Sequence, residues 1–103
     1  MKRVMVRYKL KPDQVEANEG FVRGVFEELH QTEPDGFGYA TFKLDDGVSF
    51  VHIASYEDGG AGSPLLALSA FKAFTAAIRE RCEEPPVTAT LTEVGSFRFF
   101  GAH

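Results

Sequence analysis

The sequence predicts an α+β domain of the ferredoxin-like type, a four-stranded antiparallel sheet with two helices on one face. Three observations support this prediction. The apolar periodicity changes along the chain in the order βαββαβ. The second and third strands in chain order are joined by "DDG", a strong hairpin signal. The chain has 103 residues and is 44% hydrophobic, enough for one core and too little for two. We therefore predict a single domain over residues 1–103.

The first half of the chain contains a strand followed by a helix. Residues 3–10 alternate between apolar and charged side chains, which is the period of a strand. In the helix that follows, we expect Asp13 as the N-cap, with Glu16 three residues later, and an end near His30. Its inward residues recur at helical spacing: Val15, Val22, Val25, Phe26 and Leu29.

Residues 37–44 and 48–56 are rich in aromatic and β-branched side chains, so we predict two strands paired as a hairpin. A turn at Asp46-Gly47 pairs Leu44 with Ser49, Thr41 with His52 and Tyr39 with Ala54, and paired residues share a face. The predicted register therefore places His52 and Tyr56 on the same face as Tyr39.

A glycine-rich loop at residues 58–62 precedes a second helix, opened by Ser63 as N-cap and Pro64 at the first helical position. The inward stripe of this helix is Ala67, Leu68, Phe71, Phe74, Ile78 and Cys82. Pro85 and Pro86 are expected to stop it. The last strand is predicted over residues 87–94, and an aromatic tail follows.

Both faces of the predicted hairpin are apolar, although helices cover only one of them. An uncovered apolar face of more than a few hundred Å² is rare in soluble monomers. Twofold dimers are the commonest homo-oligomers. We therefore expect a homodimer that packs through the open face of the sheet.

The charge distribution excludes several partners. The formal net charge is −4, and the Lys and Arg residues are scattered singly, so we expect no nucleic acid partner. Charges interrupt the apolar residues of "MKRVMVRYKLKP", so we expect neither a signal peptide nor a membrane span. The single Cys82 cannot form an intrachain disulfide or a cysteine metal site, which fits a reducing compartment. We predict a cytoplasmic location.

Several stretches together resemble the antibiotic biosynthesis monooxygenase-like (ABM) family of the dimeric α+β barrel superfamily. They are "PDGFGYATF" before the hairpin, the pattern Phe50-x-His52-x-x-x-Tyr56-Glu57-Asp58, "AFKAF" in the second helix and the later "VGSFRFF". The resemblance implies a dimer packed sheet against sheet, with a small molecule held between the sheet and the helices of each subunit. Members include cofactor-free oxygenases that act on polycyclic aromatic quinols, and haem-degrading enzymes.

The resemblance extends to individual positions. Tyr56 matches a family position that is often aromatic, Tyr8 matches a polar pocket position on the first strand, and His52 matches a polar pocket position on the third. Haem-degrading members carry an iron-ligating His near the start of the second helix. This sequence has Leu65 and Leu66 there, so we expect no haem, no other cofactor and no metal.

His52 has two interpretations. As a catalytic base near its normal pKa, it would remove a phenolic proton so that the substrate anion reacts with oxygen. Tyr8, Tyr39, Tyr56 and Phe50 would then bind a flat aromatic substrate. Alternatively, His52 fills the core and donates one hydrogen bond to Thr41 or to a backbone carbonyl.

Two functional classes follow from these interpretations. The first is a cofactor-independent monooxygenase for a flat aromatic or quinol-type substrate. The second is a non-catalytic ligand-binding or structural dimer module. An isomerase or lyase on the same scaffold is a third possibility. A cavity of at least ~300 Å³ between sheet and helices would favour the enzyme.

Overall fold

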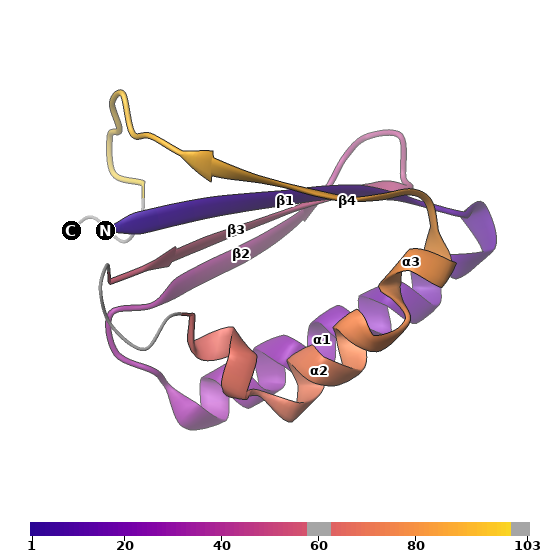
Figure 1. Ribbon diagram of the computed structural model, residues 1–103, viewed down its shortest axis with the longest axis horizontal. Coiled ribbons are helices and arrows are strands. Elements are labelled where there is room, and N and C mark those ends of the chain that lie inside the picture. The colour runs from indigo at the N-terminus through magenta and orange to yellow at the C-terminus, as the bar shows by residue number, and fades with distance from the viewer. Residues whose placement is uncertain (58–62, 100–103) are drawn as a thin grey trace.

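The computed structural model describes residues 1–57 and 63–99. They form a four-stranded antiparallel sheet in the order β2-β3-β1-β4, with helices packed on one face (Figure 1). The strands are β1 (Lys2–Leu10), β2 (Gly38–Lys43), β3 (Ser49–Tyr56) and β4 (Cys82–Leu91). The helices are α1 (Val15–Thr32), α2 (Ser69–Ala76) and α3 (Ile78–Arg81), and two short 3-10 turns are η1 (Pro12–Gln14) and η2 (Pro64–Ala67). The predicted ferredoxin-like fold is confirmed. The loop expected at 58–62 lies outside the described residues.

The β2–β3 hairpin has the predicted register, with Tyr39 paired to Ala54 and Thr41 paired to His52. Its loop is held by Asp46, whose Oδ1 accepts hydrogen bonds from the backbone N–H groups of Val48 (2.9 Å) and Ser49 (2.8 Å). Gly47 has a φ of 78°, a conformation that glycine adopts without strain. This turn fixes which residues of β3 face the helices, and it places His52 among them.

Helix α1 begins and ends later than predicted. The chain first makes the η1 turn at Pro12, and no side chain caps α1, so the predicted N-cap at Asp13 is wrong. Proline at the first position of a tight turn favours this geometry because its φ is already fixed. The helix runs to Thr32, and Glu33 closes it in the left-handed conformation, with its N–H donating to the carbonyl of Leu29.

The predicted second helix is interrupted at two points. The cap at Ser63 is confirmed, since its Oγ accepts from the N–H of Leu65. The backbone then becomes extended at Leu68 and breaks again at Ala77, so η2, α2 and α3 replace one continuous helix. The α2 start is stabilised from outside, because the Glu28 carboxylate on α1 accepts from the N–H groups of Ser69 and Ala70.

Strand β4 begins at Cys82, five residues before the predicted start at 87, and ends at Leu91 rather than 94. Cys82 is therefore a buried strand residue, not a helical one. Pro85 and Pro86 lie within the strand. Because β4 is an edge strand beside β1, proline there need not donate on the open side. The β1–β4 register shifts between Arg7 and Lys9.

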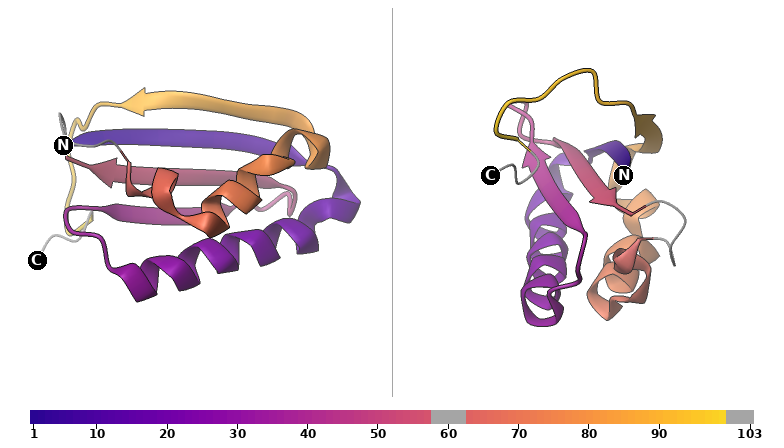
Figure 2. Two further views of the ribbon diagram at one scale, coloured as in Figure 1. Left: turned by 60° about the horizontal axis from the view of Figure 1, so that its bottom comes forward. Right: turned by 90° about the vertical axis from the view of Figure 1, so that its left-hand side faces the viewer.

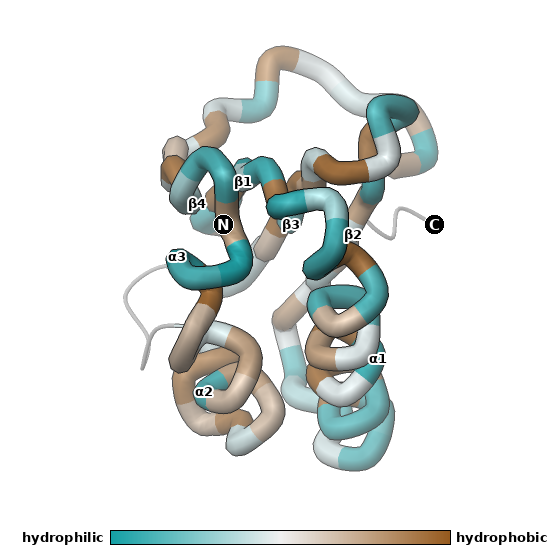
Figure 3. Tube along the Cα trace, turned by 90° about the vertical axis from the view of Figure 1, so that its right-hand side faces the viewer, coloured by the Kyte–Doolittle hydropathy of each residue, from teal (hydrophilic) through white to brown (hydrophobic). Residues whose placement is uncertain are grey.

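The two long helical segments lie side by side beneath the sheet, and no helix within residues 1–57 and 63–99 covers the opposite face (Figures 2 and 3). The segment after β4 arches over that outer face (Figure 2, right). Several apolar side chains are exposed there or on the edge strand and the tail: Phe42, Val87, Val94, Phe97 and Phe99. The buried core instead lies between the sheet and the helices, around Tyr8, Phe50 and Phe74.

Candidate functional site

A cavity of about 390 Å³ lies between the sheet and the helical layer. Residues of all four strands form one wall, and residues of η2, α2 and α3 form the other. Its lining includes Val6, Tyr8, Tyr39, His52, Tyr56, Leu65, Phe71 and Phe74. The volume exceeds ~300 Å³, the lower end of the usual range for ligand sites. The cavity is therefore as large as the sequence analysis required for a ligand site between the sheet and the helices.

His52 is the polar centre of this cavity wall, with only 4% of its surface exposed. Its Nε2 lies 2.7 Å from the Tyr8 hydroxyl. Its Nδ1 lies 2.7 Å from the Tyr39 hydroxyl and 3.0 Å from Thr41 Oγ1. Both ring nitrogens therefore have protein partners, supplied by the two strands that flank β3, namely β1 and β2.

The hydrogen bonds continue from Tyr8 into the helices. Asn18 on α1 donates from Nδ2 to the Tyr8 hydroxyl at 2.8 Å. Arg81 at the end of α3 donates from Nε to Asn18 Oδ1 at 3.3 Å, and from Nη2 to the carbonyl of Phe74 at 2.6 Å. Asn18 is 0% and Arg81 is 5% exposed. A buried polar network thus joins α3, α1, β1, β3 and β2.

Burial favours the neutral forms of the three titratable rings in this network, those of His52, Tyr39 and Tyr8. It lowers the pKa of His52 from its ordinary 6.5 to about 4. Burial also raises the pKa of Tyr39 to about 12, while a hydrogen bond with Thr41 acts in the opposite direction. The pKa of Tyr8 is raised as well, mainly by burial. The near-normal pKa expected for a His52 base is therefore not found, because the charged imidazolium would lose its hydration here.

The structure brings together four of the five site residues named from the sequence: Tyr8, Tyr39, His52 and Tyr56 all line the cavity. Phe50 does not. It is buried behind Tyr8, with the two rings stacked at a centroid distance of 5.7 Å. The hydrogen bond from His52 to Thr41, expected if His52 is a core residue, is also present.

Sequence reasoning missed Asn18 and Arg81. Asn18 follows Val15 by three residues and precedes Val22 by four, so it occupies the inward stripe of α1. Arg81 follows Phe74 by seven residues and Ile78 by three, and so continues the stripe of the second helical segment. A polar residue inside an apolar helical stripe is the signal that could have found both.

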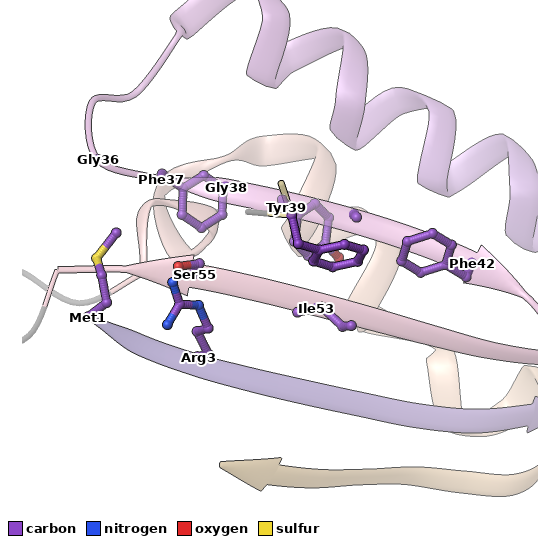
Figure 4. A pocket seen from close by; sticks show the side chains of 11 residues that line it. Met1, Arg3, Gly36, Phe37, Gly38, Tyr39, Phe42, Ile53 and Ser55 are labelled. Carbon is purple, nitrogen blue, oxygen red and sulfur yellow. The ribbon is translucent and has the colours of Figure 1, made fainter. Parts of the chain in front are cut away.

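A larger hollow of about 650 Å³ lies on the opposite, outer face of the sheet (Figure 4). Phe42 and Ile53 line it from β2 and β3, Arg3 from β1, and Phe99 from the tail. His52 does not reach it. The inner cavity therefore combines enclosure with the polar network, and we take it as the candidate functional site.

No three or more His, Cys, Asp or Glu side chains gather as a potential metal site within residues 1–57 and 63–99. None of the helices in those ranges has the length and apolar character needed to cross a bilayer.

The fold of the described residues is the one found in solved structures of ABM proteins. No protein-family model and no curated protein sequence matches the chain. Solved structures do match. A structure described as an antibiotic biosynthesis monooxygenase superposes with a TM-score of 0.76 at 21% identity, over 92% of this chain and 100% of that one.

Two further structures have the same fold. One is Rv0793 from Mycobacterium tuberculosis, with a TM-score of 0.68, 20% identity, and coverage of 92% of this chain and 96% of that one. The other is SnoaB from Streptomyces nogalater, described as a cofactor-independent oxygenase, with a TM-score of 0.61, 21% identity, and coverage of 92% and 94%. Similarity at these identities establishes the fold. The resemblance to ABM proteins is confirmed at that level.

Proposed function

We propose that this protein is a cofactor-independent monooxygenase that acts on a flat phenol- or quinol-type aromatic bound in the inner cavity. The observation that carries the proposal is the position of His52 and Tyr39, hydrogen-bonded at 2.7 Å in the wall of an otherwise largely apolar cavity. The shared fold with SnoaB, a cofactor-independent oxygenase, supports the same reaction class.

The proposed reaction needs only the substrate and dioxygen. The ionised phenol is electron-rich and reacts with O2 at a ring carbon, where a C–O bond forms and a C–H bond is broken. Dioxygen accepts four electrons; one of its oxygen atoms becomes the new carbonyl of a quinone, and the other leaves as water. The protein then has to bind the ring, exclude bulk water and stabilise the anion.

In this proposal His52 helps to stabilise the substrate phenolate and does not accept the phenolic proton. Its pKa of about 4 lies roughly six units below that of an ordinary phenol, so proton transfer to the imidazole is strongly unfavourable. The phenolic proton is instead lost to solvent as the substrate enters the cavity, before bulk water is excluded. His52 holds the Tyr39 hydroxyl at the cavity wall, where a hydrogen bond to the substrate oxygen favours its ionised form.

Aromatic side chains are proposed to hold the flat ring. Phe71 and Phe74 line the helical side of the cavity, and Tyr56 lines the sheet side. The Phe74 ring lies 5.4 Å from the His52 ring, between centroids. Phe50 contributes by stacking on Tyr8. Such faces bind planar substrates through offset stacking.

Oxygen consumption tests the proposed function. We expect wild-type protein to accelerate O2 uptake by at least one flat substrate among 1-naphthol, 1,4-dihydroxynaphthalene and anthrone, with label from ¹⁸O2 in the product. Tyr39→Phe is expected to lower the rate about 10²-fold, the loss typical of one removed oxyanion donor. Exposed Glu27→Gln is the matched control. No catalysed uptake with any of these substrates would contradict the proposal.

The alternative is a non-catalytic ligand-binding module of the same fold. One observation favours it: both nitrogens of His52 are occupied by protein groups, as in a satisfied core residue. Binding of 1-naphthol in the inner cavity without any catalysed O2 uptake would support this alternative.

We also propose that the outer face of the sheet forms a homodimer. Phe42 is 49% exposed there and borders the 650 Å³ hollow (Figure 4). Sedimentation at micromolar concentration is expected to give twice the chain mass of 11.4 kDa. Phe42→Asp should shift the protein to monomer, whereas Leu66→Asp, at an apolar residue on η2 that is more exposed still, should not. A monomeric wild type would refute the dimer.

The cytoplasmic location predicted from the sequence stays a proposal. The thiol of Cys82 is free and buried, and burial raises its pKa, as is usual for an inert cysteine in a reducing compartment.

A further inference from the structure

Arg81 is a buried cation without an acidic partner among the described side chains. Its guanidinium lies between two aromatic rings, 4.5 Å from the centroid of Phe21 and 5.5 Å from that of Phe74. A guanidinium has five N–H donors and no acceptor. The Arg81 guanidinium therefore donates in both of its hydrogen bonds, to Asn18 Oδ1 and to the carbonyl of Phe74, and this fixes one end of the buried network.

Arg81 determines how the Asn18 amide is oriented. Its Nε donates to Asn18 Oδ1, which leaves Nδ2 to face Tyr8 at 2.8 Å. The flipped amide would point an N–H group at the guanidinium, donor against donor, and this is unfavourable. Asn18 therefore donates to the Tyr8 oxygen.

The proton of the Tyr8 hydroxyl then has a single acceptor among the described groups. Tyr8 is 2% exposed, and its oxygen contacts only Asn18 Nδ2 and His52 Nε2 by hydrogen bonds. Because Nδ2 is a donor, the Tyr8 proton must point to His52 Nε2. A buried hydroxyl proton without an acceptor would cost roughly 1–3 kcal/mol.

The direction continues through the imidazole to the cavity. A neutral His52 that accepts at Nε2 carries its proton on Nδ1. That proton points to the hydroxyls of Tyr39 and Thr41, at 2.7 and 3.0 Å. The imidazole then has no nitrogen left that could accept from either hydroxyl. One of the two hydroxyl protons can go to the other hydroxyl, and the second is left for another acceptor. Of the two residues, Tyr39 is the one that lines the cavity.

We call this series the donor chain; its members are Arg81, Asn18, Tyr8, His52 and Tyr39. We infer that the donor chain ends in a hydroxyl donor at Tyr39, so that the cavity takes flat aromatics through an acceptor oxygen, as a carbonyl or phenolate. Arg81 and Asn18 are the positioning residues that set its direction. The inference rests on the proposed function only in taking the inner cavity as the ligand site.

The charges around the cavity agree with this polarity. Arg79 lies at its rim, and none of the described residues that line it is an Asp or a Glu. Arg81 lies buried behind the network, so the two formal charges that the described part of the chain places at the site are both positive. An oxygen that carries full or partial negative charge is therefore favoured over a second donor.

Asn18→Asp should reverse the donor chain with little change in shape. A carboxylate at position 18 can pair with Arg81, but it cannot donate to Tyr8. The Tyr8 proton would then point to the carboxylate, and Nε2 of His52 would donate to the Tyr8 oxygen. Nδ1 becomes an acceptor for Tyr39, so the cavity loses its donor while every residue keeps a partner.

The probes are 9-fluorenone and fluorene, which share a flat three-ring frame and differ by a carbonyl in place of a CH2 group. We expect wild-type protein to bind fluorenone about tenfold more tightly than fluorene by calorimetric titration. We also expect the infrared carbonyl stretch of bound fluorenone to move to lower frequency, because a hydrogen bond weakens the C=O bond.

Tyr39→Phe and Asn18→Asp are each expected to abolish both the preference and the frequency shift, whereas Tyr56→Phe, at a cavity tyrosine outside the donor chain, keeps the shift. Circular dichroism checks that each variant is folded. Equal binding of the two probes, or a shift that survives Asn18→Asp, overturns the donor chain and leaves the cavity as a ligand site. Binding of neither probe overturns both the donor chain and the site used in the proposed function.

Discussion

His52→Ala is expected to lower the free energy of unfolding by about 3 kcal/mol. The side chain is 4% exposed, so its removal enlarges the neighbouring cavity. It also takes the acceptor from Tyr8 and the partner from Tyr39, and the Tyr8 hydroxyl is buried too deeply for water to replace it. For a domain of this size, the melting midpoint should fall by roughly 15 °C.

Tyr56→Phe is the matched control for this prediction. Tyr56 lies on the same strand and lines the same cavity, but its hydroxyl has no hydrogen bond within the described part of the chain. The change should cost less than about 1 kcal/mol. A fall of only a few degrees in the melting midpoint of His52→Ala would show that packing does not depend on the imidazole. This result would contradict the role of His52 in the buried network.

The stability of the wild type is expected to fall by about 2 kcal/mol between pH 7 and pH 5. His52 has a pKa of about 4 when folded and an ordinary value of 6.5. Below pH 6.5 the His52 imidazole is protonated in the unfolded chain, whereas in the folded chain it stays neutral down to about pH 4. The stability that comes from the neutral buried His52 is therefore fully present above pH 6.5 and is lost as the pH falls from 6.5 towards 4. Chemical denaturation at the two pH values measures it.

His52→Gln is the control for the acid effect, because it keeps a hydrogen-bonding side chain that does not titrate. Asp46 does not obscure the result, since its hydrogen bonds to Ser49 and the backbone hold its pKa at about 2, below the range measured. The variant should lose most of the dependence between pH 7 and 5. An unchanged slope would mean that His52 is not the buried neutral group described above.

The parts of the fold set by local chemistry were predictable from the sequence. Alternation identified β1 and the hairpin, and the turn at Asp46 fixed the register, so the faces of His52 and Tyr39 followed directly. The breaks in the second helix were not predictable in this way. The cap on α2 comes from Glu28, 41 residues earlier than Ser69, and no local pattern encodes that contact.

The site was predicted in part for the same reason. Tyr8, Tyr39, His52 and Tyr56 follow from strand periodicity, because residues that share a face of a sheet meet at one cavity wall. Asn18 and Arg81 meet them only through the packing of α1 and α3 against the sheet. The pKa of His52 depends on that packing too, since helices that cover the ring remove its hydration.

The proton positions of the donor chain can be read directly from ¹⁵N NMR of the histidine ring nitrogens at pH 7, in the wild type and in Asn18→Asp. We expect a neutral His52 with its proton on Nδ1 in the wild type. In the variant, the proton should move to Nε2. A wild-type His52 that carries its proton on Nε2, or on both nitrogens, would contradict the donor chain and its hydroxyl donor at Tyr39.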